Sequence, residues 1–122
     1  MTRLILSLII SVATSSAQLI ISEVHPTPSA GESEWVECVN TTSRSLVLRD
    51  YLICDTRTCV RVDLLEIPAR GLVVLTRDAS ALRESRWLPR DAVMMEVALP
   101  SLNNTTDRVE VRDDDSVLID SM

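Results

Sequence analysis

The residues that could form a catalytic nucleophile and its base are few in this 122-residue chain. His25 is the only histidine, and a hydrolase would need it beside a nucleophile such as the Cys38 thiol. Cys38 lies in the alternating stretch WVECV, the pattern of a buried apolar residue, and His25 precedes Pro26 at the end of a predicted strand. With two glycines the chain has neither a Gly-rich phosphate loop nor a serine elbow. We therefore expect that it is not an enzyme.

Three consecutive acidic residues, Asp113, Asp114 and Asp115, are the best candidates for a metal site. Calcium takes six to eight oxygen ligands, often from one loop, and Asp107 and Asp120 lie nearby in the sequence. The run also separates two alternating segments, where a hairpin turn is needed and Asp is a favoured residue. A solvated turn is the preferred interpretation, calcium binding is the alternative, and no cofactor is predicted.

Three glutamates, Glu23, Glu34 and Glu37, have the residue type for acid–base chemistry. In regular strands Glu37 should lie on the face opposite Cys38, and Glu23 on the same face as Ile21. We expect these acids to form surface ion pairs with arginines or to support strand pairing, rather than to act in catalysis.

Cys54 and Cys59 flank a four-residue turn between two strand-like segments in YLICDTRTCVRV. Facing positions of an antiparallel pair lie close enough for a disulfide. The chain-entropy model gives such a small loop a stabilisation of about 2 kcal/mol. We predict a Cys54–Cys59 disulfide and a buried, unpaired Cys38.

Residues 1–17 read as a secretory signal peptide. Arg3 supplies a positive start, residues 4–12 form a short apolar run, and small residues end at Ala17, the expected cleavage point. A membrane anchor over residues 4–21 is the competing interpretation, but polar residues interrupt it and a spanning helix needs about 20 mainly apolar residues. We expect an exported protein whose mature chain, 18–122, has no transmembrane segment.

The mature chain is strongly acidic. Removal of Arg3 leaves 11 basic against 18 acidic residues, a net charge of −7. Nucleic acids and anionic membranes attract clustered positive charge. We therefore expect no nucleic-acid partner, and predict an unidentified protein or envelope component instead.

Short apolar runs of period two dominate the rest of the sequence and predict strands. Only residues 78–87 suggest a helix, with Asp78 as its N-cap. This pattern predicts an all-β sandwich with at most one short helix. The predicted strands are residues 19–24, 34–40, 46–48, 51–54, 60–62, 71–76, 93–97, 107–112 and 116–120.

The stretch LPSLNNTTDRV, residues 99–109, predicts a corner between two strands. Leu99 and Leu102 should anchor it on the core, while Pro100 lacks the amide hydrogen of a ladder strand. The polar residues 103–106 can bond to nearby backbone and turn the chain. Asn40, Asn103 and Asn104 also fit the glycan acceptor pattern, which we interpret as a chance occurrence in turns.

Five segments in order, ISEVHPTP, EWVECVN, LVLRDYLICD, GLVVLTRD and LPSLNNTTDRVEVRDDDSVLIDS, resemble the lamin tail domain over residues 19–121. The resemblance implies an immunoglobulin-like β-sandwich without catalytic activity. The Cys54–Cys59 pair is not part of the general family pattern and rests on spacing and compartment alone. The positions that match the family motif in a structural role are Glu23, Trp35, Glu37, Asn40, Leu99, Pro100, Leu102, Asn103, Asn104, Asp107 and Asp120.

Taken together, the sequence predicts a non-catalytic exported module with a structural or protein-interaction role at the cell envelope or outside the cell. The alternative is an accessory domain, or a truncated piece, of a larger secreted hydrolase or nuclease. A calcium-dependent adhesion protein that uses the aspartate turn is a further alternative.

Overall fold

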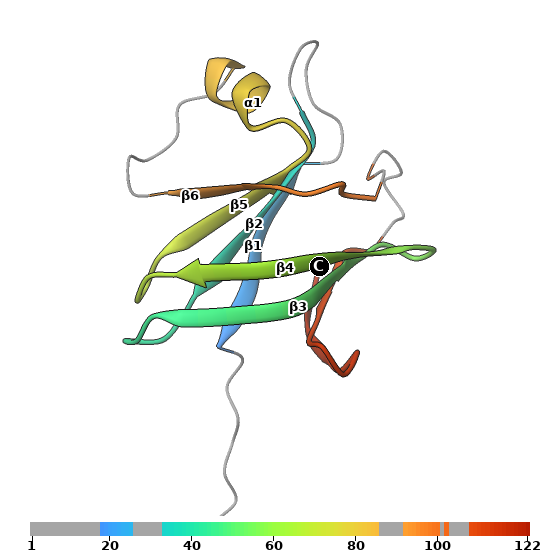
Figure 1. Ribbon diagram of the computed structural model, residues 1–122. Helices are drawn as coiled ribbons and strands as arrows, with labels where there is room; N and C mark the ends of the chain where they lie inside the picture. Colours follow the sequence, from blue (N-terminus) through green and yellow to red (C-terminus); the bar gives the residue numbers. More distant parts are fainter. Residues whose placement is uncertain (1–17, 26–32, 86–91, 101, 103–107) are drawn as a thin grey trace, which may run out of the picture.

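The computed structural model describes residues 18–25, 33–85, 92–100, 102 and 108–122. The strands of this part of the chain form two four-stranded sheets (Figure 1). Sheet A has the order β1 (Leu19–His25), β2 (Trp35–Asn40), β5 (Leu72–Thr76) and β6 (Val93–Glu96). Sheet B has the order β4 (Cys59–Ile67), β3 (Leu46–Cys54), β7 (Glu110–Arg112) and β8 (Leu118–Ser121). One short helix, α1 (Ala79–Ser85), follows β5. The predicted all-β sandwich with one short helix is confirmed.

The main hydrophobic core lies between the two sheets, because its buried side chains come from both. Leu99 and Leu102 belong to it and are fully buried, so the predicted anchoring of this corner is confirmed. A second, smaller cluster of Trp35, Val74 and Leu82, with Met94 packed against it, joins sheet A to α1. Trp35 is therefore buried outside the main core.

Asp78 caps α1 as predicted. Its carboxylate Oδ1 accepts a hydrogen bond from the Ala81 backbone N–H at 3.0 Å, which satisfies one of the free donors of the first turn. The predicted helix ran to residue 87, of which residues 86 and 87 lie outside the described part of the chain.

β3 and β4 are longer than predicted. In both strands the alternation of buried and exposed side chains is interrupted, and the predicted segments end at the interruption. Arg49 and Asp50 are both exposed on β3, and Asp63 and Leu64 are both exposed on β4. Asp50 has a φ of 55°. The interruptions lie opposite each other, since the register is continuous from the Leu46–Ile67 pair to Cys54–Cys59. The two predicted segments 46–48 and 51–54 are thus one nine-residue strand, and 60–62 is the start of another.

The predicted position of Glu23 on the same face as Ile21 is wrong, because β1 contains a bulge. Ile21 pairs with Cys38 and Glu23 pairs with Glu37, so Ser22 is the extra residue. One extra residue shifts the following side chains to the other face. Glu23 consequently shares the outer face of sheet A with Glu37.

Candidate functional site

Among the residues that the structure describes, the side-chain amide of Asn40 forms the most extensive set of hydrogen bonds. It lies at the end of β2 and is fully buried. Its Nδ2 donates to the carbonyl oxygens of Arg44, Ile67 and Pro68 at 2.7, 3.1 and 3.0 Å. Its Oδ1 accepts from the backbone N–H and the hydroxyl of Thr42, at 2.9 and 2.7 Å. Asn40 therefore ties the β2–β3 loop to the end of β4.

This network also decides the glycan question at Asn40. A glycan attaches to the side-chain nitrogen of an exposed asparagine. That nitrogen is buried here and donates to three carbonyls. The folded protein therefore offers no acceptor at this position. The other two acceptor patterns, at Asn103 and Asn104, lie outside the described residues, as does the family-motif residue Asp107.

Two charged side chains hold the corner that contains Leu99, Pro100 and Leu102. The Nε and Nη2 atoms of Arg77 both donate to the Leu99 carbonyl, with Nε at 2.7 Å. The Glu34 carboxylate accepts from the Leu102 backbone N–H at 3.1 Å. Glu34 thus makes a structural contact with a backbone group, and its carboxylate has no ion pair with another described residue. Arg77 was not singled out from the sequence, because nothing local relates it to a carbonyl 22 residues away.

Asp120 joins the edges of the two sheets. Its carboxylate Oδ2 accepts a hydrogen bond from the Ile21 backbone N–H at 2.7 Å, immediately before the bulge in β1. The bulge residue Ser22 then donates its hydroxyl to Glu37 Oε1 at 2.6 Å. Asp120, at the edge of β1, and Glu37, on the neighbouring strand β2, therefore both hold the bulge.

Cys38 and His25 do not form a catalytic pair. Cys38 is 1% exposed in the main core, while His25 pairs with Trp35, which faces α1 on the other side of sheet A. The His25 ring stacks on Trp35 with 5.4 Å between centroids. Burial, together with the nearby carboxylates of Asp120 and Glu37, raises the pKa of the Cys38 thiol to about 12. The thiolate needed for nucleophilic attack is therefore strongly disfavoured.

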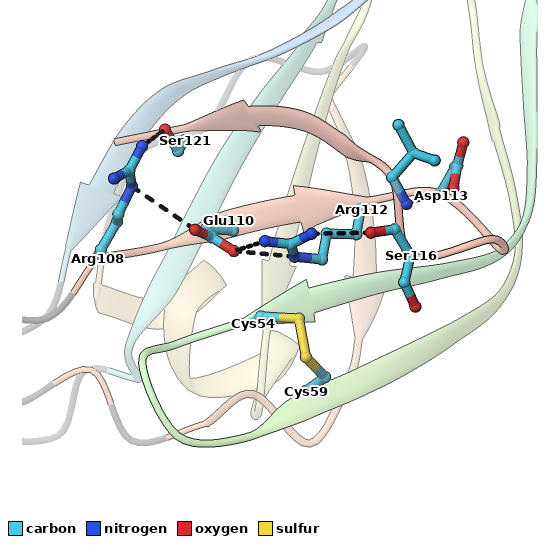
Figure 2. Close-up of polar contacts among 9 residues, drawn as sticks. Cys54, Cys59, Arg108, Glu110, Arg112, Asp113, Ser116 and Ser121 are labelled. Atoms are coloured by element: carbon cyan, nitrogen blue, oxygen red, sulfur yellow. Dashed lines mark hydrogen bonds and ion pairs between the residues drawn. A yellow bond between two sulfur atoms is a disulfide. The ribbon is translucent and has the colours of Figure 1, made fainter.

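The predicted disulfide between Cys54 and Cys59 is present and closes the β3–β4 hairpin (Figure 2). The turn inside it is also held by Asp55, whose Oδ1 accepts from the backbone N–H groups of Arg57 and Thr58 at 2.7 and 2.6 Å. The hydrogen bond from Thr58 is the main cause of the lowered pKa of Asp55. Cys38 is the unpaired cysteine, as predicted.

The acidic run at 113–115 forms the turn between β7 and β8. Asp113 Oδ1 accepts from the backbone N–H groups of Asp115 and Val117, both at 2.9 Å. Asp114 and Asp115 are exposed. Within the described ranges, no three His, Cys, Asp or Glu side chains are grouped so that they could hold a metal ion.

Charged side chains of alternating sign follow β7 on the outer face of sheet B. Figure 2 shows Arg108, Glu110 and Arg112 in a row, continued at its ends by Ser121 and Ser116. The Glu110 carboxylate is 2.7 Å from Arg112 Nη2 and 3.7 Å from Arg108 Nε. These groups are partly or largely exposed, so each pair contributes little stability.

No family model matches the chain, and no curated protein shows significant similarity to it. In addition, no helix in the described part of the chain has the length and apolar content required to cross a bilayer.

Proposed function

We propose that this protein is an exported, non-catalytic β-sandwich of the lamin tail type, with a structural or protein-interaction role at the cell envelope or outside the cell. The observation that carries the proposal is that side chains whose residue types could bind or react with a ligand are engaged within the fold. Asn40, Glu34 and Asp120 bind backbone groups of distant segments, and Cys38 is buried with a pKa of about 12. Side chains engaged in this way stabilise a scaffold rather than act on a substrate.

The disulfide supports the export part of the proposal. Disulfides persist in oxidising compartments and are rare in a reducing cytosol, and the hairpin of this chain carries one between Cys54 and Cys59. The order of charged, apolar and small residues in 1–17 is the second support. The sandwich agrees with the lamin tail resemblance, although many unrelated proteins share this architecture, so the five matching segments remain its basis.

Export is tested by producing the full chain in a bacterial host and analysing each cell fraction. We expect the exported protein to begin at Gln18 and to have a mass two hydrogens lower than that of the reduced chain. A Leu8→Arg variant, which places a charge in the apolar run, is the matched control and should stay inside the cell. Wild-type protein that remains in the cytosol with residues 1–17 attached would refute the export proposal.

The interaction role is tested with the purified exported protein as bait for solubilised envelope fractions. The control bait is the same protein after reduction and denaturation, because it has the same composition and charge without the folded surface. We expect at least one envelope component to bind the folded bait alone. Equal recovery by the two baits would leave the structural role and eliminate the interaction role.

A further inference from the structure

The strand β4 forms one edge of sheet B and pairs only with β3 among the described residues. It is nine residues long, and its other edge can accept a further strand. Leu64, near its middle, is 50% exposed, and Val47 on the neighbouring strand is 52% exposed. An edge of this length with exposed apolar side chains is a potential pairing surface.

The burial pattern of β4 is nearly symmetric about the bond between Asp63 and Leu64. From residue 60 to 67 the side chains are half-buried, exposed, buried, exposed, exposed, buried, exposed and buried. Read in reverse, the exposed positions coincide with exposed positions and the buried ones with buried or half-buried ones. An antiparallel copy centred on this bond therefore keeps every side chain on its correct face, which a shift by one residue would destroy.

The charges of Arg61 and Glu66 on β4 are complementary in the same register. Arg61 lies opposite Glu66 of the second copy, and the two-fold symmetry produces this pair twice. Opposite charges at facing positions of an antiparallel pair stabilise it, whereas like charges destabilise it. Charged residues on an edge usually prevent pairing. In this register they favour it for a second copy, and the two Leu64 side chains lie at the centre of the interface.

We propose that two copies of this chain associate through their β4 strands, antiparallel, with the two-fold axis between Asp63 and Leu64. The existing β3–β4 pair is a precedent within the molecule. β3 carries the same double exposed step, at Arg49 and Asp50, and aligns it with Asp63 and Leu64 of β4. A second β4 would meet the edge opposite β3 with its own step aligned in the same way, joining the two B sheets. This proposal does not depend on export.

Charge reversal at Arg61 and Glu66 tests the register. Sedimentation velocity of the purified wild-type protein over a wide concentration range should show reversible dimerisation. Arg61→Glu or Glu66→Arg should each weaken self-association by about tenfold or more, since each sets like charges against each other twice. The double variant should restore the wild-type constant. Arg49→Glu is the matched control, because it makes the same charge change one strand away from the edge, and it should dimerise normally.

Circular dichroism and thermal melting will show whether each variant is folded. Arg61 forms an ion pair with Asp50 at 3.7 Å in which both side chains are more than half exposed, so its loss should not unfold the protein. Hydrogen exchange of the wild-type protein gives a readout that needs no variant: amides of β4 should exchange more slowly at high than at low concentration. A wild-type protein that stays monomeric, or a folded double variant that does not dimerise, would overturn the proposal.

Discussion

Replacement of Asn40 by alanine should be among the most damaging single substitutions in this protein. The change removes an amide that donates to three carbonyl oxygens and accepts two hydrogen bonds from Thr42. The contact with the Ile67 carbonyl is buried, and leaving a buried polar group without a partner costs about 1–3 kcal/mol. The remaining contacts lie nearer the surface, where water can replace them, and the two Nδ2 hydrogens are shared among three carbonyl oxygens, so these contacts together contribute about 1 kcal/mol.

The sum is a loss of about 3 kcal/mol in the free energy of unfolding. Domains of this size are stable by about 5–15 kcal/mol, so Asn40→Ala removes a large share of the total. At about 5 °C per kcal/mol, the melting temperature should fall by about 15 °C. Equilibrium unfolding in urea, followed by circular dichroism with the disulfide intact, measures the difference directly.

Two further variants separate the roles of the Asn40 amide. Asn40→Asp keeps an acceptor for Thr42 and loses the donor, so at neutral pH it should be at least as unstable as Asn40→Ala. Ser43→Ala, in the same loop and exposed, is the control and should change stability by less than about 0.5 kcal/mol. A cost below about 1 kcal/mol for Asn40→Ala, or an Asn40→Asp variant as stable as wild type, would refute the role assigned to the amide.

Three other predictions concern the cysteines and the hairpin turn. Replacing Cys54 and Cys59 together by alanine should lower the free energy of unfolding by about 2 kcal/mol without changing the fold, as measured by urea unfolding and circular dichroism; an unfolded double variant would contradict this. The lowered pKa of Asp55 means that its contribution to stability is present above its usual value of 3.8 and is lost as the pH falls through the folded-state pKa. The stability difference between wild type and Asp55→Asn should therefore shrink in strong acid, and a difference independent of pH would refute this linkage. The Cys38 thiol should react with iodoacetamide at pH 8 only after denaturation, and rapid labelling of the native protein, followed by mass spectrometry, would contradict its burial.

The sequence predicts the elements of this fold well where the local pattern of residues is uninterrupted. The segments of β2 and β5, the capping of α1 by Asp78 and the hairpin at Cys54–Cys59 all follow from local patterns. Prediction fails where one extra residue changes the face of the sheet on which the following side chains lie. The bulge at Ser22 moves Glu23 to the other face of sheet A, because local sequence does not show that β2 pairs with one residue fewer.

The same limit applies to β3 and β4. Exposed pairs such as Asp63–Leu64 look like strand ends, since alternation stops there. The strands continue because each interruption meets a matching one in its partner, which is a property of the pair and not of either segment. The hydrogen bonds of Asn40 and Asp120 could not be predicted from the sequence for a related reason. Asn40 reaches Ile67 and Asp120 reaches Ile21 across 27 and 99 residues, and no local spacing encodes such contacts.

The two outer strands of sheet B, β8 and β4, differ in the contacts that they make within the molecule, and this difference affects where a partner can bind. At β8, the Asp120 carboxylate binds the Ile21 backbone N–H of sheet A, so polar groups at this margin already have partners within the molecule. At β4, the side chains of Arg61 and Glu66 contact Asp50 of β3 and Ser45 just before it, and both partners are exposed. Exposed ion pairs and hydrogen bonds exchange with water at little cost. Association at β4 would therefore sacrifice little of the monomer's stability, whereas association at β8 would have to break the contact that joins the two sheets.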